Sequence, residues 1–188
     1  MDQIRGDELI IIEGKKFSKL PFRSFRDGVF GKNLEDALHK LIEDFPEIIP
    51  GTQISPHEED PPRFVLLKHE MAAGSGSSDF VLVDQNAIPT LVEAKLFENP
   101  EAKRDVIGQI LDYAANAVEE WGNGKLRGQA DEFWTGKNRV VENMLVEKFD
   151  GENFDVDSFW KKLEDNLEQN NIRMIIAADK LRLNVRRI

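Results

Sequence analysis

The residues best suited to chemistry lie in the middle of the chain, between residues 79 and 95. Asp79 precedes one apolar run, and Glu93 and Lys95 follow another, with a short polar turn at residues 85–87 between the runs. Folded as an antiparallel hairpin about that turn, the segment places Asp79 opposite Glu93, and the Cβ atoms of such a pair lie about 4.5–5.5 Å apart. Lys95 shares a face with Glu93 because side chains alternate along a strand.

Two carboxylates held this close repel each other, and the repulsion raises a pKa unless a cation lies between them. Mg²⁺ or Mn²⁺ meets that demand, because both ions suit oxygen ligands. A lysine next to the ion adds a positive donor. The triad of Asp79, Glu93 and Lys95 therefore predicts a divalent-metal site at one end of an otherwise apolar hairpin.

The first element that must position these residues is a helix that begins after Asn33 and ends before Pro46. Asparagine is a good N-cap, and apolar residues recur at helical spacing between the two. Glu35 lies in the first turn beside the apolar stripe. It either faces the metal or complements the helix dipole, as first-turn acids do, and Glu43 is an alternative acid further along.

A second helix is predicted from Asn99 to about Trp121, with Pro100 at its first position. Gln109 and Tyr113 lie along one edge of its apolar face, and they stack because residues four apart are neighbours on a helix. Gln109 either orients an active-site group or is simply exposed, in which case Tyr113 belongs to the core.

The remaining segments alternate between strands and helices. Residues 172–178 are nearly all apolar, which predicts a buried strand in a central or parallel position. Further strands are predicted over residues 9–13 and 63–70, further helices over 139–149 and 157–170, loops over 47–62 (with a short extended piece at 52–55) and 71–78, and an irregular excursion over 122–136.

This alternation predicts an α/β fold, with a mixed central sheet flanked by helices. We expect one domain over residues 1–188, with an N-terminal arm or hairpin over 1–30, a core motif region over 34–114, and C-terminal helices and a strand over 122–188. An amphipathic stretch at 181–188 shows the start of a helix without a stop signal, so the sequence leaves open a further C-terminal domain.

Asp79 followed by Glu93-Ala94-Lys95 resembles the motif of the PD-(D/E)xK nuclease superfamily, which has the restriction-endonuclease-like fold. Ser78 is a departure, since the family often has proline before the aspartate. The resemblance implies a restriction-endonuclease-like core in this chain.

Two further features extend the resemblance. Gln109 and Tyr113 are similar to the Q-x-x-x-Y extension of the RecB-like branches, and Glu35 is similar to the acid that the first core helix adds to the metal site. The resemblance implies an endonuclease that hydrolyses DNA phosphodiester bonds with Mg²⁺ or Mn²⁺. It assigns metal binding to Glu35, Asp79, Glu93 and the carbonyl of Ala94, catalysis to Asp79, Glu93, Lys95 and Gln109, and a substrate contact to Tyr113.

Composition bears on partners and compartment. The 188 residues carry 25 Lys and Arg against 35 Asp and Glu, and the net charge of −10 works against binding of nucleic acid. The absence of cysteine excludes disulfides and thiolate metal sites. No apolar run is long enough for a membrane span, and the first residues are no signal peptide. We expect a cytoplasmic protein that contacts DNA and no membrane.

Two other functions stay open. The chain could be a binding module on the same fold, without chemistry, that recognises nucleic acid or holds a protein through its acidic surface. Alternatively, the three charges form a salt-bridged rim on an ordinary α/β domain. The histidines His39, His57 and His69 are too scattered to predict a zinc site, although His69 could approach the active end. The sequence does not settle whether the chain forms a homodimer.

Overall fold

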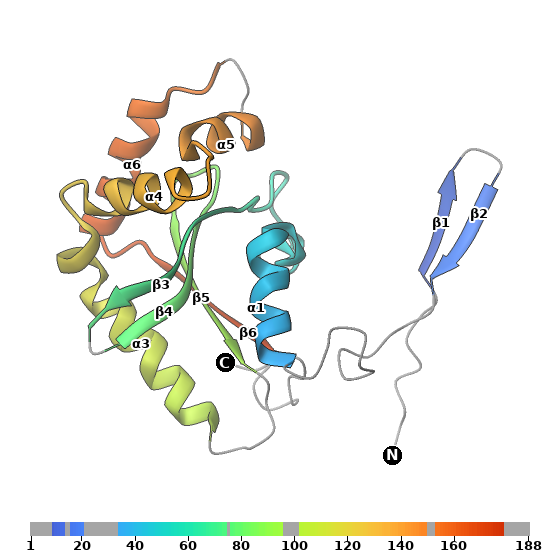
Figure 1. The fold of residues 1–188 in the computed structure, drawn as a ribbon, viewed down its shortest axis with the longest axis horizontal. Helices are drawn as coiled ribbons and strands as arrows, with labels where there is room; N and C mark the ends of the chain where they lie inside the picture. The colour runs from blue at the N-terminus through green and yellow to red at the C-terminus, as the bar shows by residue number, and fades with distance from the viewer. Residues whose placement is uncertain are drawn as a thin grey trace.

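A four-stranded mixed sheet, in the order β3–β4–β5–β6, forms the centre of the computed structural model (Figure 1). The structure describes residues 9–13, 16–20, 34–74, 76–95, 102–149 and 153–178. Strands β3 (Val65–Ala73), β4 (Gly76–Val83) and β5 (Pro89–Lys95) form an antiparallel meander, and β6 (Arg173–Ala178) runs parallel to β5. The predicted α/β class and the mixed sheet are confirmed.

Helices cover both faces of this sheet. Helix α1 packs against one face, α3 and α6 pack against the other, and α4 and α5 lie along β3 (Figure 1). The helices are α1 (Leu34–Asp44), the 3-10 helix η1 (Pro46–Ile48), α2 (Gly51–Ile54), α3 (Ala102–Trp121), α4 (Lys125–Thr135), α5 (Val141–Lys148) and α6 (Val156–Glu168). Within the described residues, no helix combines the length and the apolar character needed to cross a membrane.

The register of the β4–β5 hairpin is the one predicted from the sequence. Its paired residues are Phe80 with Val92, Val81 with Leu91, Leu82 with Thr90, and Val83 with Pro89. One further step along the same register brings Asp79 beside Glu93. Because side chains alternate along a strand, a slip of one residue would have moved one of these two carboxylates to the opposite face.

Buried Asp84 fixes the turn that sets this register. Its Oδ1 accepts the backbone N–H groups of Asn86 and Ile88 at 2.9 and 3.0 Å. Its Oδ2 accepts a 2.9 Å hydrogen bond from Arg173 of β6, and Arg173 also donates to the hydroxyl of Thr90 at 3.0 Å. One carboxylate thus closes the turn and ties β6 to the hairpin.

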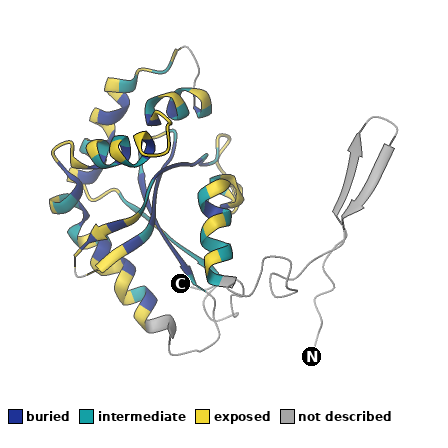
Figure 2. Ribbon diagram, viewed as in Figure 1, coloured by how far each residue is buried: buried dark blue, intermediate teal, exposed yellow. Residues whose placement is uncertain are grey.

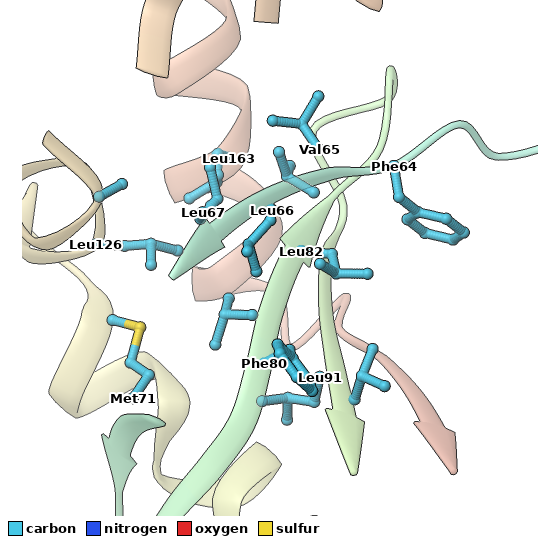
Figure 3. Close-up of a cluster of buried hydrophobic side chains, with 14 of the residues drawn as sticks. Phe64, Val65, Leu66, Leu67, Met71, Phe80, Leu82, Leu91, Leu126 and Leu163 are labelled. Atoms are coloured by element: carbon cyan, nitrogen blue, oxygen red, sulfur yellow. The ribbon is translucent and has the colours of Figure 1, made fainter. Parts of the chain in front are cut away.

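The core lies between the sheet and its helices. The central strands are buried along most of their length, whereas the helices alternate buried and exposed faces (Figure 2). Phe80, Leu82 and Leu91 pack in the cluster that Figure 3 shows, together with Leu126 of α4 and Leu163 of α6. This packing supplies a rigid support for whatever the ends of β4 and β5 carry.

Residues 122–136 were predicted as an irregular excursion. This prediction is wrong, because most of these residues form α4. Leu126, Ala130 and Trp134 are buried at four-residue spacing, which is the pattern of a packed helix. The indole N–H of Trp134 donates to the carbonyl of Leu66 at 2.9 Å and fixes α4 to β3. Gly128 is exposed, so the helix needs no side chain there.

Other boundaries also differ. Residues 71–78 were predicted as a loop, but β3 continues to Ala73 and pairs with β4 from Gly76. The predicted loop over 47–62 holds most of η1 and all of α2 instead of an extended piece at 52–55. Strand β6 is parallel, which was one of the two predicted positions, but it lies at the edge of the four-stranded sheet. The predicted burial is wrong, because β6 is only half-buried and Met174 is exposed.

The remaining predictions have simple outcomes. Strands β1 (Leu9–Glu13) and β2 (Lys16–Leu20) pair antiparallel as a separate sheet, which confirms an N-terminal hairpin. Helices α5 and α6 are confirmed, and Asp155 caps α6 by accepting the backbone N–H of Ser158 at 3.0 Å. The predicted start of the second helix at residues 99–101 and the stretch at 181–188 lie outside the described residues.

Candidate active site

Asp79 of β4 and Glu93 of β5 meet where the two strands lie side by side. The backbone N–H of Asp79 donates to Oε1 of Glu93 at 3.4 Å, and the backbone N–H of Ala94 donates to Oδ2 of Asp79 at 2.8 Å. Each carboxylate therefore accepts a hydrogen bond from the backbone of the opposite strand. The hairpin brings the two acids together as its predicted register requires.

Glu93 is the more deeply buried of the two acids, with 1% of its surface exposed. Burial, and then the nearby charge of Asp79, raise the pKa of Glu93 to about 7. Among the described residues, no lysine, arginine or histidine lies within ion-pair distance of its carboxylate. The position therefore holds a carboxyl group whose negative charge lacks a close partner.

Asp79 has a partner that the sequence analysis missed. Nε2 of His39, on α1, lies 3.4 Å from Oδ2 of Asp79, and the imidazole ring packs edge-on against Phe80 with ring centroids 5.2 Å apart. Burial alone would raise the pKa of Asp79, but the contacts with His39 and the Ala94 amide hold it below its ordinary value. The same contact raises the pKa of His39.

Lys95 and Glu35 form the outer part of the site. Nζ of Lys95 lies 3.4 Å from Oε1 of Glu35, and both side chains are partly exposed. Burial alone would lower the pKa of Lys95, but the charges of Asp79 and Glu35 raise it above its ordinary value. Glu35 therefore approaches the site, as predicted, but it does so through the lysine.

These contacts belong to one face of α1. Glu35, His39 and Glu43 are spaced four residues apart, so they form a stripe, which we call the α1 stripe. Glu35 contacts Lys95 of β5 and His39 contacts Asp79 of β4. Glu43 completes the stripe, because His69 of β3 places Nδ1 3.3 Å from its Oε2. Each residue of the α1 stripe thus reaches a different strand of the meander. The spacing of Glu35 and His39 on one helix was the signal that could have identified His39.

Gln109 and Tyr113 form a pair of their own on α3. Nε2 of Gln109 donates to the hydroxyl of Tyr113 at 2.9 Å. Tyr113 is only 2% exposed, and its hydroxyl lies 2.6 Å from the position that a Cβ atom on Gly76 would take. Among the contacts of the described residues, none links Gln109 or Tyr113 to the carboxylates. The pair therefore packs against Gly76 at the start of β4, three residues before Asp79.

The described side chains include no ready group of three histidines or carboxylates that would hold a metal ion. Asp79 is held by His39 and the Ala94 amide, and Glu35 is held by Lys95. Neither the family models, nor the curated proteins, nor the solved structures with which the chain was compared gave a match.

Proposed function

We propose that this chain is a metal-dependent nuclease that hydrolyses DNA phosphodiester bonds, with Asp79, Glu93 and Lys95 as its active site. The observation that carries the proposal is the Glu93 carboxyl group, which is buried beside Asp79 without a close cation among the described residues. Two acids and a lysine at the ends of paired strands are the set that the PD-(D/E)xK resemblance implies. A buried carboxylate without a balancing partner, such as Glu93, costs stability, and functional sites are where proteins keep such groups.

A divalent cation fits this donor set. Carboxylate oxygens of Asp79 and Glu93 would hold Mg²⁺ or Mn²⁺, and the resemblance implies the carbonyl of Ala94 as a third hard oxygen ligand. Glu35 would join them only after it leaves Lys95. A bound ion supplies an acidified water and offsets the charge of the scissile phosphate.

The other side chains have roles that their contacts support. Lys95 is charged and partly exposed, so it would contact a phosphate oxygen and stabilise the negative charge that develops there. His39 holds the Oδ2 side of Asp79 and keeps that carboxylate ionised. Gln109 would act at a distance, through Tyr113, on the position of β4.

The order of elements also supports the finer fold assignment. Helix α1 precedes an antiparallel meander, and the helices α3 to α6 lie in the connection from β5 to the parallel strand β6. The acids lie on the two middle strands of this mixed sheet, with helices on both faces. This is the arrangement of a mixed central sheet flanked by helices that the restriction-endonuclease-like resemblance implies.

The test is a cleavage assay with labelled single-stranded and double-stranded DNA in Mg²⁺, Mn²⁺ or EDTA. We expect cutting only with metal, a loss of more than about a hundredfold in Glu93→Gln and in Lys95→Ala, and no loss in Glu132→Gln, an exposed acid of α4. Thermal unfolding of each variant checks that the fold survives. Equal cutting by Glu93→Gln and the unaltered protein would overturn the proposal.

A second candidate is a non-catalytic binding module on the same fold. It is favoured by the pairing of Lys95 with Glu35 and by the net charge of −10. The two candidates differ in metal binding. A working site gains stability with Mn²⁺ by mass action, about 2.7 kcal/mol at one hundred times the dissociation constant, and Glu93→Gln loses that gain. A module without chemistry shows no gain in either protein.

A further inference from the structure

The last residue of the α1 stripe anchors a second cluster of charged groups. The carboxylate of Glu43 forms an ion pair with His69 of β3 at 3.3 Å. It forms another with Lys137, which follows α4. One carboxylate therefore holds two basic side chains from different elements. Glu43 is the more buried of the three, whereas His69 and Lys137 are each more than a third exposed.

Aromatic rings pack against the side chains of His69 and Lys137. The ring of Phe133 lies 4.8 Å from the ring of His69 and 4.5 Å from Nζ of Lys137. Arg139 lies over the ring of Trp134 at 5.1 Å, next to this pair. A cation over an aromatic face is attracted to the ring, which favours that position. The cluster therefore places the charges of Lys137 and Arg139, and a histidine that adds a charge when protonated, at defined positions on a protein that is acidic as a whole.

The neighbouring acids are largely neutralised. Asp44 pairs with Lys40 at 3.0 Å, and Glu47 pairs with Lys148 at 2.8 Å. Both acids line a cavity of about 320 Å³ beside the cluster. Arg139 and Glu147 also line this cavity, and their charges are opposite. Apart from Glu43, the acids and bases around the cavity are thus balanced, whereas the whole chain carries a net charge of −10.

The cluster lies close to the candidate active site. His39 and Glu43 are four residues apart on α1, which places them about 6 Å apart along the helix axis. His69 is also paired with Phe80 across the β3–β4 ladder, and Phe80 follows Asp79 directly. A DNA strand that passes Asp79 and continues along the α1 stripe would therefore reach His69 and Lys137 next.

We propose that His69 and Lys137 form a phosphate-binding subsite for the DNA strand, one helical turn of α1 from the Asp79–Glu93 carboxylates. This proposal rests on the proposed nuclease function and adds to it the path of the substrate. In this arrangement Glu43 holds the two basic groups in place and competes with the phosphate for them. Removal of the Lys137 charge and removal of the Glu43 charge must therefore change DNA affinity in opposite directions.

The experiment measures binding of a fluorescent single-stranded oligodeoxynucleotide and of its duplex to the full chain in EDTA, over a series of salt concentrations. We expect Lys137→Ala and His69→Gln to weaken binding about threefold to tenfold, with a salt dependence lower by about one phosphate contact for Lys137→Ala. We expect Glu43→Gln to tighten binding about twofold to fivefold. The matched controls are Lys161→Ala and Glu168→Gln on α6, where both residues are exposed.

Several results would overturn the subsite. One is equal affinity of Lys137→Ala and Lys161→Ala, and another is equal affinity of Glu43→Gln and Glu168→Gln. Variants that lower the melting temperature but bind DNA like their controls would show that the cluster only fastens α1 to α4. Displacement of the oligonucleotide by low millimolar inorganic phosphate at constant ionic strength would assign the cluster to free phosphate.

The outcomes separate this proposal from the nuclease itself. DNA binding that depends on Lys137, without cleavage in any metal, would end the nuclease proposal and keep the subsite. Metal-dependent cleavage that needs Glu93, with unchanged DNA affinity in Lys137→Ala, would end the subsite alone. A protein that neither binds nor cuts DNA would end both.

Discussion

Nε2 of His39 lies 3.4 Å from Oδ2 of Asp79, and it has no hydrogen-bond partner among the described residues. The contact joins α1 to β4 at the candidate carboxylates. It favours the ionised form of Asp79 and the protonated form of His39.

The first prediction concerns this pair. His39→Phe keeps a ring against Phe80 but removes the imidazolium, so the pKa of Asp79 should rise. Carboxyl ¹³C NMR titration in EDTA measures the change directly. His57→Phe, in the exposed loop after α2, is the control and should leave Asp79 as it is. An unchanged Asp79 titration in His39→Phe would show that His39 does not affect the pKa of Asp79.

The second prediction concerns the pH dependence of stability without metal. The pKa of Glu93 is about 7 in the folded chain and about 4.5 when unfolded, so the folded state binds this proton more tightly. The stabilisation is complete below pH 4.5 and is lost as the pH rises through 7. The loss amounts to roughly 3 kcal/mol at most.

Glu93→Gln isolates this contribution, because the amide does not titrate. In EDTA, the stability of Glu93→Gln relative to the unaltered protein should increase from pH 4.5 to pH 8. Urea unfolding at several pH values measures the difference. A constant difference over this range would contradict a buried, protonated Glu93.

The third prediction concerns the fit between Gly76 and Tyr113. A Cβ atom on Gly76 would lie 2.6 Å from the Tyr113 hydroxyl, so Gly76→Ala should cost about 1–3 kcal/mol of unfolding free energy. The cost should fall in a Tyr113→Phe background, which removes that oxygen. A double-mutant cycle gives the coupling. Gly128→Ala, with no atom within 4 Å of its Cβ in α4, should be neutral or stabilising.

The fourth prediction concerns the buried ion pair of Asp84 and Arg173. Asp84→Ala removes the turn's acceptor and leaves Arg173 without its carboxylate, so it should cost about 3–5 kcal/mol. The exposed pair of Arg63 and Asp60 is the control, and Asp60→Ala should cost less than about 1 kcal/mol. Similar losses at both sites would mean that burial does not strengthen the Asp84 contact.

The sequence predicted the hairpin because the relevant signals are local. Two apolar runs and a short polar turn allow one register, and that register decides that Asp79 and Glu93 meet. The predicted approach of Glu35 also follows from its place on an amphipathic helix. What the sequence did not show is that Glu35 pairs with Lys95 and does not join the two acids.

The parts that were missed depend on contacts between distant elements. His39 is one of several polar residues on an amphipathic helix, and only the packing of α1 across β4 gives it a role. Helix α4 was hidden by glycines at 122, 124 and 128, which normally indicate turns, although Leu126, Ala130 and Trp134 have helical spacing. Strand β6 is apolar enough for a central strand, and its position at the edge follows from the topology alone.

The α1 stripe restricts which insertions helix α1 can tolerate. Successive residues of a helix are rotated by about 100°, so one residue inserted between Glu35 and Glu43 would turn every later member of the stripe away from its strand. The Lys95, Asp79 and His69 contacts could then not all persist. Insertions of three or four residues nearly restore the rotation but move the later members along the helix axis. The length of this segment of α1 is therefore fixed by the spacing of the strands beneath it.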